Sequence, residues 1–457
     1  MKRTLQQFAA DCGGELLGEE RTYTQVSTDT RKLAAGELFV ALRGPNFDGN
    51  TFVDAAFAMG AAGAVVDRRP AVAAAALPRI LVPDTLVALQ RAAAVWRKRC
   101  AIPVVGVAGS NGKTTVKEMI ASILAQLGPT LATRGNLNNH IGVPLTLLRL
   151  AATDRFAVIE MGANNAGEVA KLARLAAPAV GIVTNAGEEH LEGFGSLDGV
   201  ARAEGEMFAG LSSDGVAIIN EDDAYAAMWR SMTRARVLSF GVSAAADVRA
   251  ENIRSSLDEQ GFRAQFVMIS PLGRAECELR LAGMHNVVNA LGAAAAAIAA
   301  GATLEPVVSG LATMRPVAGR LQWKAARGGG WIIDDSYNAN PSSLQAAIDV
   351  LAVLPGRRWL VIGEMGELGA QAVASHQAAG TYALRHGVER LFAMGELTKY
   401  TVEQFGAAAQ WFASSEALTD AVARAMTAEV RLLVKGSRVN RLERLVQALA
   451  EPQRKAG

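Results

Sequence analysis

The stretch Gly109-Ser-Asn-Gly-Lys-Thr-Thr115 decides how this chain is interpreted. It follows an apolar run, Ile102-Pro-Val-Val-Gly-Val107, and it precedes a helical pattern of apolar residues from Val116 to Leu127. A strand, a glycine turn, Lys-Thr and a helix in this order are typical of a phosphate cradle. Glycine lets backbone N–H groups approach the phosphates, and the helix N-terminus adds partial positive charge. We therefore predict a strand, a phosphate-binding loop and a helix.

Two side chains of this loop carry the predicted chemistry. Lys113 can reach the β- and γ-phosphates, and the hydroxyl of Thr114 can bind Mg²⁺. The strict spacing of such loops would place glycine at position 107, where this chain has Val107, so we interpret the loop as a shortened variant that suggests one branch of ATP-using proteins. An ordinary glycine turn before a core helix is the weaker alternative, because Gly-Lys-Thr falls at the junction. The predicted nucleotide contacts are Gly109, Ser110, Asn111, Gly112, Lys113, Thr114 and Thr115.

The composition is that of an ordinary globular enzyme with two to four domains, since the chain has 457 residues and a net charge of +2. This charge gives no reason to expect nucleic acid or a membrane surface as a partner. The three cysteines lie far apart and lack the spacing of metal ligands. We therefore expect neither disulfides nor a zinc site, and we expect the protein to work in the reducing cytoplasm. Polar residues interrupt the apolar residues near the N-terminus, so we do not expect a signal peptide there. The alanine-rich stretches are too short to span a membrane.

The fold class that we expect is α/β with three domains. Residues 1–85 predict a small α/β unit, and residues 86–313 predict a central ATPase-like domain with a mostly parallel sheet, because apolar strands alternate with helical stretches. Within it, residues 246–283 alternate polar and apolar residues, which predicts antiparallel strands. Residues 314–457 predict a second, Rossmann-like α/β domain. Expected strands are 24–31, 37–42, 65–66, 80–82, 157–160, 180–184, 216–220, 331–334, 358–362, 390–393 and 430–434, and expected helices include 52–62, 198–211 and 286–300.

Two strand ends after the loop carry polar residues where ligands bind in parallel sheets. Glu160 ends one strand and could hold or position Mg²⁺, although a surface carboxylate is the plain alternative. His190 follows the next strand, and it could serve a metal or phosphate, although a lone histidine is usually structural or solvated.

Several asparagines add candidate contacts without adding charge. The segment from Thr133 to Pro144 is rich in amide side chains and indicates a functional loop, although by itself it is weakly specific. Asn286 opens an alanine-rich helix, where it could cap the N-terminus or bond adenine.

In the third unit, an arginine and two strand ends stand out. Arg320 could stabilise charge on a transferring phosphoryl group. The acidic pair at the end of the strand, which includes Asp335, can face a ligand. Lys435-Gly-Ser-Arg438 ends another strand and suits a substrate carboxylate, because arginine binds carboxylates with two parallel hydrogen bonds.

Taken together, these motifs resemble those of the Mur ligase family of cell-wall ATP-dependent amide ligases, over essentially the whole chain. The resemblance rests on Ser27 to Arg31, Gly36 to Phe39, Asp48-Gly49, Gly109 to Thr115, Gly135 to Pro144, Glu160 to Gly162, His190 to Phe194, His285 to Asn289, Gly319-Arg320, Asp335 to Pro341, Gly363 to Gly369 and Lys435 to Arg438. The asparagine-rich stretch and Ser-Tyr-Asn-Ala-Asn-Pro resemble the branch that adds D-alanyl-D-alanine. This implies ATP and Mg²⁺ as cofactors, and UDP-N-acetylmuramoyl-tripeptide and D-alanyl-D-alanine as substrates.

The resemblance also implies roles for individual residues. Lys113 and Thr114 would bind phosphates and Mg²⁺, and Glu160 and His190 would belong to the magnesium shell. The roles that it implies for the rest are adenine contact for Asn286 and Asn289, nucleotide contact from the C-terminal domain for Arg320 and Asp335, a place between nucleotide and substrate for Asn138 and Asn139, the uridine nucleotide pocket for Ser27, Thr28 and Arg31, and substrate contact for Asn338, Lys435, Ser437 and Arg438.

One position departs from the family pattern. Many members carry a lysine after the histidine, modified by CO₂ to a carbamate that serves a second Mg²⁺. The family's Ala-Lys-Gly-Glu-Ile is Ala203-Glu-Gly-Glu-Met207 here. Our hypothesis is that the side chain of Glu204 supplies the carboxylate itself, without modification by CO₂. Because this side chain is shorter than a carbamylated lysine, a water would bridge it to the metal.

The implied reaction joins a carboxylate to an amine through an acyl phosphate, which needs no covalent enzyme intermediate. Two rivals stay open: a relative that adds one amino acid to the nucleotide-peptide or glutamate to a folate, and an ATP-dependent switch without ligase activity. The uridine motif argues against a folate, and retention of Glu160, His190, Arg320 and Asp335 argues against a switch. We expect a monomer.

Overall fold

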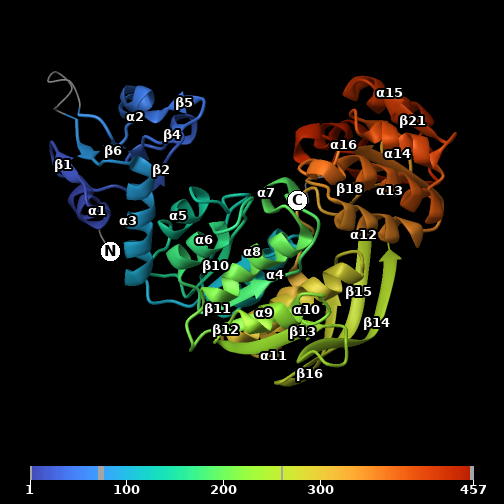
Figure 1. Cartoon of the computed structure of the whole chain (residues 1–457), viewed down its shortest axis with the longest axis horizontal. Helices are drawn as coiled ribbons and strands as arrows, with labels where there is room; N and C mark the ends of the chain where they lie inside the picture. The colour runs from blue at the N-terminus through green and yellow to red at the C-terminus, as the bar shows by residue number, and fades with distance from the viewer. Residues whose placement is uncertain (1–2, 70–76, 259–260, 453–457) are drawn as a thin grey trace.

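The computed structural model describes residues 3–69, 77–258 and 261–452. Three large sheets of five, nine and six strands follow one another along the chain, and each belongs to a separate body of the elongated molecule (Figure 1). A further sheet of two strands lies in the first body. The chain is therefore an α/β protein of three domains, as the sequence predicts.

The N-terminal domain holds a five-stranded sheet in the order β1-β7-β6-β3-β2, parallel except at β1. Helix α3 leaves this domain and lies against the central one, where Trp96 donates to the carbonyl of Leu150 at 3.1 Å. The elements are α1 (Leu5–Cys12), β1 (Glu15–Leu17), β2 (Val26–Ser27), β3 (Leu38–Val40), β4 (Arg43–Gly44), β5 (Phe47–Asp48), α2 (Val53–Ala58), β6 (Gly63–Val66), β7 (Arg79–Leu81) and α3 (Thr85–Arg99).

The sequence prediction was least accurate in this domain. A strand over residues 24–31 was wrong beyond Val26–Ser27, because the carboxylate of Asp29 accepts the N–H of Arg31 and starts a 3₁₀ turn at Thr30–Lys32. The expected helix over 52–62 spans only Val53–Ala58, and α1 and β1 were missed.

The central sheet has the order β16-β15-β14-β13-β12-β11-β8-β10-β9. It is parallel from β9 to β14, and β14, β15 and β16 pair antiparallel, as the alternation in 246–283 predicts. The elements are β8 (Val104–Ala108), α4 (Lys113–Ala125), β9 (Thr130–Ala132), α5 (Gly142–Leu147), β10 (Phe156–Glu160), α6 (Glu168–Ala176), β11 (Val180–Val183), α7 (Leu191–Phe194), α8 (Leu197–Ala209), β12 (Val216–Asn220), α9 (Ala226–Ser231), β13 (Arg236–Gly241), β14 (Val248–Asp258), β15 (Gly261–Ser270), β16 (Gly273–Leu279), α10 (Met284–Ala299) and α11 (Leu304–Thr313).

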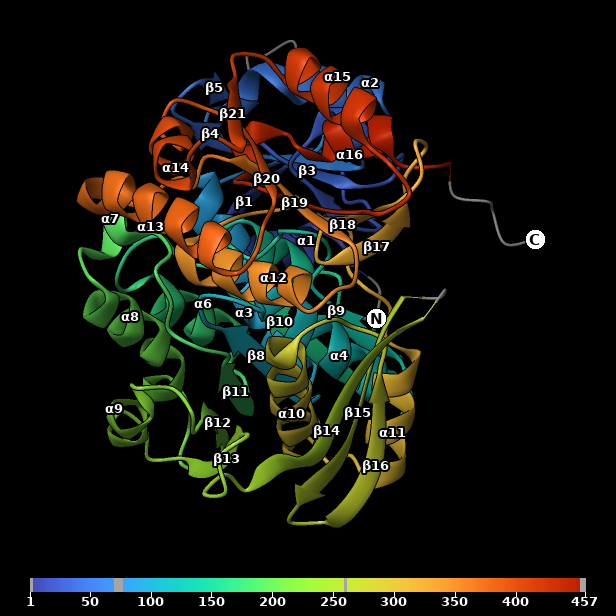
Figure 2. The same cartoon turned by 90° about the vertical axis from the view of Figure 1, so that its right-hand side faces the viewer.

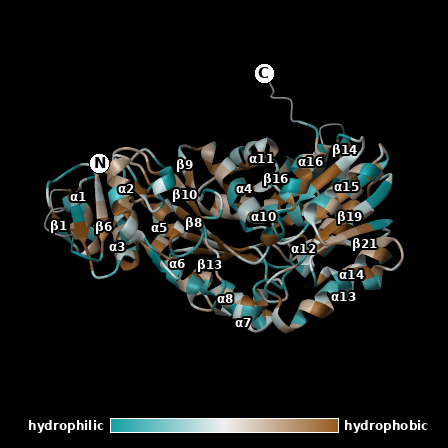
Figure 3. Cartoon of the chain, turned by 90° about the horizontal axis from the view of Figure 1, so that it is seen from above, coloured by the Kyte–Doolittle hydropathy of each residue, from teal (hydrophilic) through white to brown (hydrophobic). Residues whose placement is uncertain are grey.

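Helices cover both faces of this sheet, so both faces are buried. Each strand contributes to both faces, because its successive side chains point to opposite sides. In β8, Val104 and Ala108 join the cluster that packs on α5, α6 and α8. Val105 and Val107 join the cluster that packs on α4, α10 and α11. Figure 2 shows this layering, with α4, α10 and α11 together on one side of the sheet. Figure 3 shows hydrophobic strands between the helices.

The C-terminal domain holds a six-stranded sheet in the order β17-β18-β22-β19-β20-β21, parallel except at β17. It meets the central domain through apolar side chains, since Leu191 and Val200 belong to its core cluster, and the ring of Phe262 on β15 lies 5.2 Å from that of Trp323. The elements are β17 (Gln322–Ala325), β18 (Trp331–Asp335), α12 (Pro341–Ala352), β19 (Arg357–Gly363), α13 (Ala372–Arg385), β20 (Arg390–Met394), α14 (Thr398–Phe405), β21 (Ala409–Phe412), α15 (Ser415–Ala425), β22 (Val430–Lys435) and α16 (Glu443–Leu449).

Among the described residues, none of the helices has the length and apolar character that a membrane crossing requires.

Candidate active site

The phosphate loop lies at the end of β8, between two neighbouring strands, β10 and β11. Gly109 and Gly112 have φ of +115° and +82°. A Cβ at Gly109 would lie 2.2 Å from the Thr184 hydroxyl oxygen, so this position requires glycine. Val107 is fully buried within β8. The departure from the strict spacing therefore falls in the strand, and the loop itself is intact.

The ammonium of Lys113 is surrounded by oxygen atoms. It donates to the carbonyls of Gly109 and Ser110 and to the carboxylate of Glu189, at 2.7 Å for the last. Burial opposes its charge, but the carboxylates of Glu189 and Glu204 outweigh burial and raise the pKa of Lys113. Lys113 is therefore charged, as phosphate binding requires.

Glu160 is the end of β10 and is only 2 % exposed. Its Oε1 accepts from the amide of Asn138 at 2.9 Å, whereas its Oε2 is buried without a hydrogen-bond partner. A buried carboxylate oxygen left unpaired is costly. It fits a cation or a bound donor at this point.

Glu204 lies on α8, 1 % exposed, and its Oε2 accepts the N–H of Gly109 at 2.7 Å. Burial raises the pKa of this carboxyl to about 7, although Lys113 acts in the opposite direction. The position where the family pattern has lysine thus places a carboxylate under the phosphate loop, where it contacts backbone.

His190 begins α7 with a left-handed backbone, φ +50°. Its Nδ1 contacts the carboxylate of Glu367, from the C-terminal domain. In the part of the chain that the structure describes, no three His, Cys, Asp or Glu side chains gather closely enough to hold a metal by themselves. Mg²⁺ takes one or two carboxylates together with phosphate and water, so the unpaired oxygen of Glu160 still fits it.

The C-terminal domain reaches the loop with side chains from the start of its sheet. Arg320 donates to the hydroxyl of Thr114 at 3.2 Å, and its guanidinium lies 4.5 Å from the ring centroid of Tyr337. Asp335 is paired with Lys435 at 2.5 Å. Lys435 is only 3 % exposed, so its charge is committed to Asp335.

Asn286 and Asn289 lie on α10 beside the phosphate loop. The N-cap residue of α10 is Gly283, so the capping interpretation of Asn286 was wrong. Asn286 donates to the carbonyl of Ala282 at 2.7 Å and accepts from Asn289 at 3.2 Å. The amide of Asn289 lies against Gly112.

These groups line one cleft with a volume of about 730 Å³. Among the predicted site residues, those that line it are Ser110, Asn111, Gly112, Lys113, Thr114, Thr115, Asn138, Asn139, Glu160, His190, Asn286, Asn289, Arg320, Asp335, Asn338 and Lys435. Those outside its lining are Gly109, Glu204, Ser437 and Arg438, together with Ser27, Thr28 and Arg31 of the N-terminal domain.

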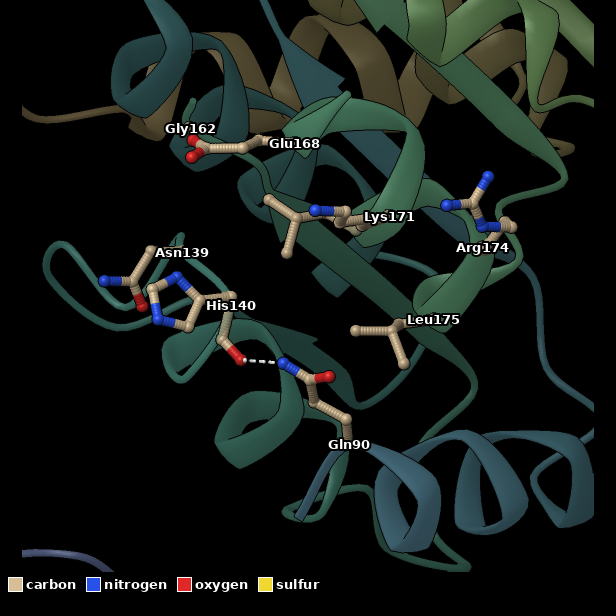
Figure 4. A pocket seen from close by; sticks show the side chains of 9 residues that line it. Gln90, Asn139, His140, Gly162, Glu168, Lys171, Arg174 and Leu175 are labelled. Atoms are coloured by element: carbon tan, nitrogen blue, oxygen red, sulfur yellow. Dashed lines mark hydrogen bonds between the residues drawn. The ribbon is translucent and has the colours of Figure 1, made fainter. Parts of the chain in front are cut away.

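A smaller pocket of about 320 Å³ adjoins the cleft on the side of the N-terminal domain (Figure 4). It lies between α3, α6 and the asparagine-rich loop, and Gln90 of α3 donates to the carbonyl of His140 at 3.0 Å. Its cations are Lys171 and Arg174, one helical turn apart on α6. The two pockets share Asn139, His140, Gly162 and Glu168.

Sequence reasoning missed several residues of the site. Glu189, the partner of Lys113, stands directly before His190 in the loop that follows β11, and a carboxylate next to a predicted site histidine was a usable signal. Asn340 and Ser342 bond the side chain of Asn111 at 2.9 and 3.0 Å across the domain boundary. No local pattern could have predicted that contact.

Comparison with known proteins agrees with this geometry. Family models match along the chain: the Mur ligase family catalytic domain at residues 22–97, the Mur ligase middle domain at 107–297, and the Mur ligase glutamate ligase domain at 319–438. The chain belongs to the Mur ligase family.

Within this family, the chain is similar to proteins of one name. It is 43 % identical over 453 residues to UDP-N-acetylmuramoyl-tripeptide–D-alanyl-D-alanine ligase of Escherichia coli K12, covering 98 % of both chains. The crystal structure of MurF from Acinetobacter baumannii superposes with a TM-score of 0.90 at 34 % identity, covering 98 % of both. MurF of Thermotoga maritima, solved in complex with ADP, has the same fold, with a TM-score of 0.82 at 24 % identity over 93 % of this chain and 96 % of that one.

Proposed function

We propose that this protein is an ATP-dependent ligase that joins D-alanyl-D-alanine to UDP-N-acetylmuramoyl-tripeptide. The observation that carries the proposal is the cleft in which the phosphate loop, the unpaired Oε2 of Glu160 and Arg320 of the facing domain meet. The sequence identity of 43 % to the E. coli ligase, over 98 % of this chain, supports these two substrates. The products are UDP-N-acetylmuramoyl-pentapeptide, ADP and phosphate.

A carboxylate is a poor acyl donor, so ATP first phosphorylates the tripeptide carboxylate. In the proposed step, a carboxylate oxygen attacks the γ-phosphorus in line and ADP leaves. Lys113 and Arg320 neutralise the charge that develops on the phosphoryl oxygens. The amine of D-alanyl-D-alanine then attacks the acyl carbon of the acyl phosphate, phosphate leaves, and a proton is lost from the nitrogen.

Mg²⁺ is part of this proposal. Thr114, Glu160 and His190 would hold it with the phosphates, and Glu204 would act beside them through water. When bound, the ion supplies positive charge against the phosphoryl oxygens. Glu160 fits this role because its Oε2 is buried and unpaired.

We assign the acyl substrate to the side of the cleft next to the N-terminal domain. Ser27, Thr28 and Arg31 of that domain would bind the uridine nucleotide, and Asn138 and Asn139 would lie between the two substrates. The smaller pocket, with Lys171 and Arg174 on its rim, suits the carboxylates of the tripeptide. On the opposite side, we assign the carboxylate of the dipeptide to Asn338, which lines the cleft, and to Arg438, whose guanidinium lies 5.2 Å from the ring centroid of Tyr337.

Lys435 and Ser437 have a different part in this proposal. Lys435 is paired with Asp335, and Ser437 accepts the N–H of Gly366 at 2.8 Å. Both therefore act by holding the loops that contact substrate.

The rest of the proposal concerns organisation. We assign substrate binding to residues 1–85, ATP binding to 86–313 and closure over the nucleotide to 314–457. Closure excludes water, which would otherwise hydrolyse the acyl phosphate. We propose a monomer, and a cytoplasmic location, for which free cysteines are the expected state.

Phosphate release tests the function directly. We expect rapid release only with ATP, UDP-N-acetylmuramoyl-tripeptide and D-alanyl-D-alanine together, and little release when the dipeptide is omitted. Release that is equally fast without the peptide substrates would indicate an ATP-dependent switch. Preference for a single amino acid or a folate would indicate another ligase.

The role of Glu204 has its own test, because a glutamate needs no CO₂ to become a carboxylate. We expect the rate of phosphate release to be unchanged when CO₂ is removed and when bicarbonate is added. Loss of activity on CO₂ removal, with recovery on addition of bicarbonate, would contradict a direct role for this carboxylate.

A further inference from the structure

A lysine that lies outside the cleft is wholly buried next to it. Lys117 is one turn after Lys113 on α4 and is 0 % exposed. Its ammonium donates to the carbonyl of Thr133 at 2.9 Å and is paired with the carboxylate of Glu118. A lysine is almost never fully buried unless it is paired. Its position therefore calls for an explanation beyond helix formation.

Thr133 joins this lysine to the strand end that carries Glu160. It follows β9, is 1 % exposed, and donates its own N–H to the carbonyl of Val158 at 3.1 Å. Its hydroxyl oxygen accepts the N–H of Glu160 at 3.0 Å. One residue thus binds Lys117 through its carbonyl and Glu160 through its side chain.

The asparagine-rich loop, defined as residues 133–144, then returns to the same strand end. The amide of Asn138 donates to Oε1 of Glu160 at 2.9 Å, and its carbonyl accepts the N–H of Gly162 at 2.9 Å. The remaining oxygen, Oε2, is left buried and unpaired. The loop therefore fixes which oxygen of Glu160 is free.

We propose that Lys117 is a positioning residue, which acts through Thr133 to hold the free oxygen of Glu160 at a fixed place relative to the phosphate loop. Helix α4 carries the phosphate loop at its N-terminus and Lys117 one turn later, so the lysine ties the loop and the carboxylate to one rigid element. This inference rests on the proposed function in one respect, that the free oxygen of Glu160 binds a divalent cation beside the nucleotide.

Variants in the two linked residues test the proposal. Lys117→Met removes the donor, and Thr133→Val removes the hydroxyl with little change of shape, whereas Thr133→Ser keeps it. The readout is Mn²⁺ affinity of the ADP-saturated full-length protein, measured by the paramagnetic resonance of free Mn²⁺. We expect Lys117→Met and Thr133→Val each to weaken Mn²⁺ binding about tenfold, which corresponds to about one well-placed hydrogen bond. We expect Thr133→Ser to stay within about twofold of the original protein.

The double variant separates this chain of contacts from general damage. If Lys117 acts through Thr133, the double variant should bind Mn²⁺ about as weakly as the worse single variant, because each change breaks the same link. Effects that multiply, or a Lys117→Met variant within about twofold of the original protein, would overturn the proposal. Lys98→Met, an exposed lysine on α3, is the matched control and should change nothing.

ADP affinity in the presence of EDTA should be the same in all variants. A drop there would mean that the phosphate loop itself was damaged, which the positioning role does not predict. Because Mn²⁺ and ADP binding need neither peptide substrate, this test can succeed or fail independently of the ligase reaction.

Discussion

The central and C-terminal domains face each other across one cleft with similar parallel sheets, but their charges are balanced differently. In the central domain, the ammonium of Lys113 is paired with the carboxylate of Glu189, and the buried carboxylates of Glu204 and Glu160 also favour its charge. In the C-terminal domain, Asp335 has Lys435 as its own partner at 2.5 Å.

This difference indicates that the two domains have different parts in binding charge. The central site holds three carboxylates for one ammonium, and one oxygen of Glu160 is buried without a partner. Burial raises the pKa of Glu204 to about 7, and the charge of Glu189 acts in the same direction. A bound cation would satisfy the unpaired oxygen of Glu160. On the C-terminal wall the charge of Asp335 is matched by Lys435, and Arg320 and Asn340 reach toward the phosphate loop.

The largest effect is expected at Lys113, whose positive charge these three carboxylates favour. Lys113→Met should lower phosphate release about 10³-fold, because it removes charge stabilisation at the phosphoryl group and leaves the three carboxylates unopposed. The measurement is steady-state turnover with saturating substrates. Lys98→Met, the control, should retain full activity. If the turnover of Lys113→Met stayed within tenfold of the original protein, the charge of Lys113 would not have the role that the central site assigns to it.

Arg320 tests the other wall. Arg320→Ala should lower kcat about 10²-fold but change the ADP dissociation constant by less than about fivefold, because the phosphate cradle belongs to the central domain. Turnover and ADP titration together measure this. Arg424→Ala, an exposed arginine on α15, serves as control. If kcat and affinity fell by the same factor, the C-terminal wall would be part of the ground-state pocket.

The buried carboxyl of Glu204 should make the stability of the central domain depend on pH. Its folded pKa is raised from 4.5 to about 7, so its contribution to stability is fully present below about pH 4.5 and is lost as pH rises through about 7. The amide that the substitution Glu204→Gln introduces is neutral at every pH.

The stability advantage of Glu204→Gln over the original protein should therefore grow between pH 6 and pH 8, by on the order of 1 kcal/mol. Urea unfolding without nucleotide or divalent cation measures it. A difference that is the same at both pH values would mean that the carboxyl titrates normally.

The smallest effect is expected where the two domains touch. Ser342→Ala removes the hydroxyl that accepts from the amide of Asn111 at 3.0 Å, and leaves the bond between Asn111 and Asn340 in place. We expect KM for ATP to rise about two- to threefold with kcat unchanged, because one partly exposed hydrogen bond contributes little. A larger fall in kcat would mean that this contact controls closure.

The sequence predicted the sheets best where burial is two-sided. Strands β8, β10, β11 and β12, and strands β18, β19, β20 and β22, are continuous apolar runs bounded by polar turns, whereas β9, β13, β17 and β21 were missed because their patterns are short or mixed. The N-terminal domain was predicted worst, since a capping side chain at Asp29 ends the strand that was expected over residues 24–31.

For the site, local patterns identified the phosphate loop and the strand ends, because these residues act next to their neighbours in sequence. They could not predict that Lys435 is committed to Asp335, 100 residues away, or that the carboxylate of Glu204 faces the N–H of Gly109. They also gave no reason to separate Lys117 from an ordinary helix surface.

By itself, then, the sequence determined the phosphate loop, the α/β class and the family, because glycine conformation, helix polarity and side-chain alternation are local properties of the chain. Only the tertiary structure decided which charges meet. Glu189 pairs with Lys113, and Glu204 and Glu160 from two other segments favour its charge, while Asp335 has its partner on a neighbouring strand. The balance of charge in a cleft is a sum over distant residues, and only folding brings them within reach of one another.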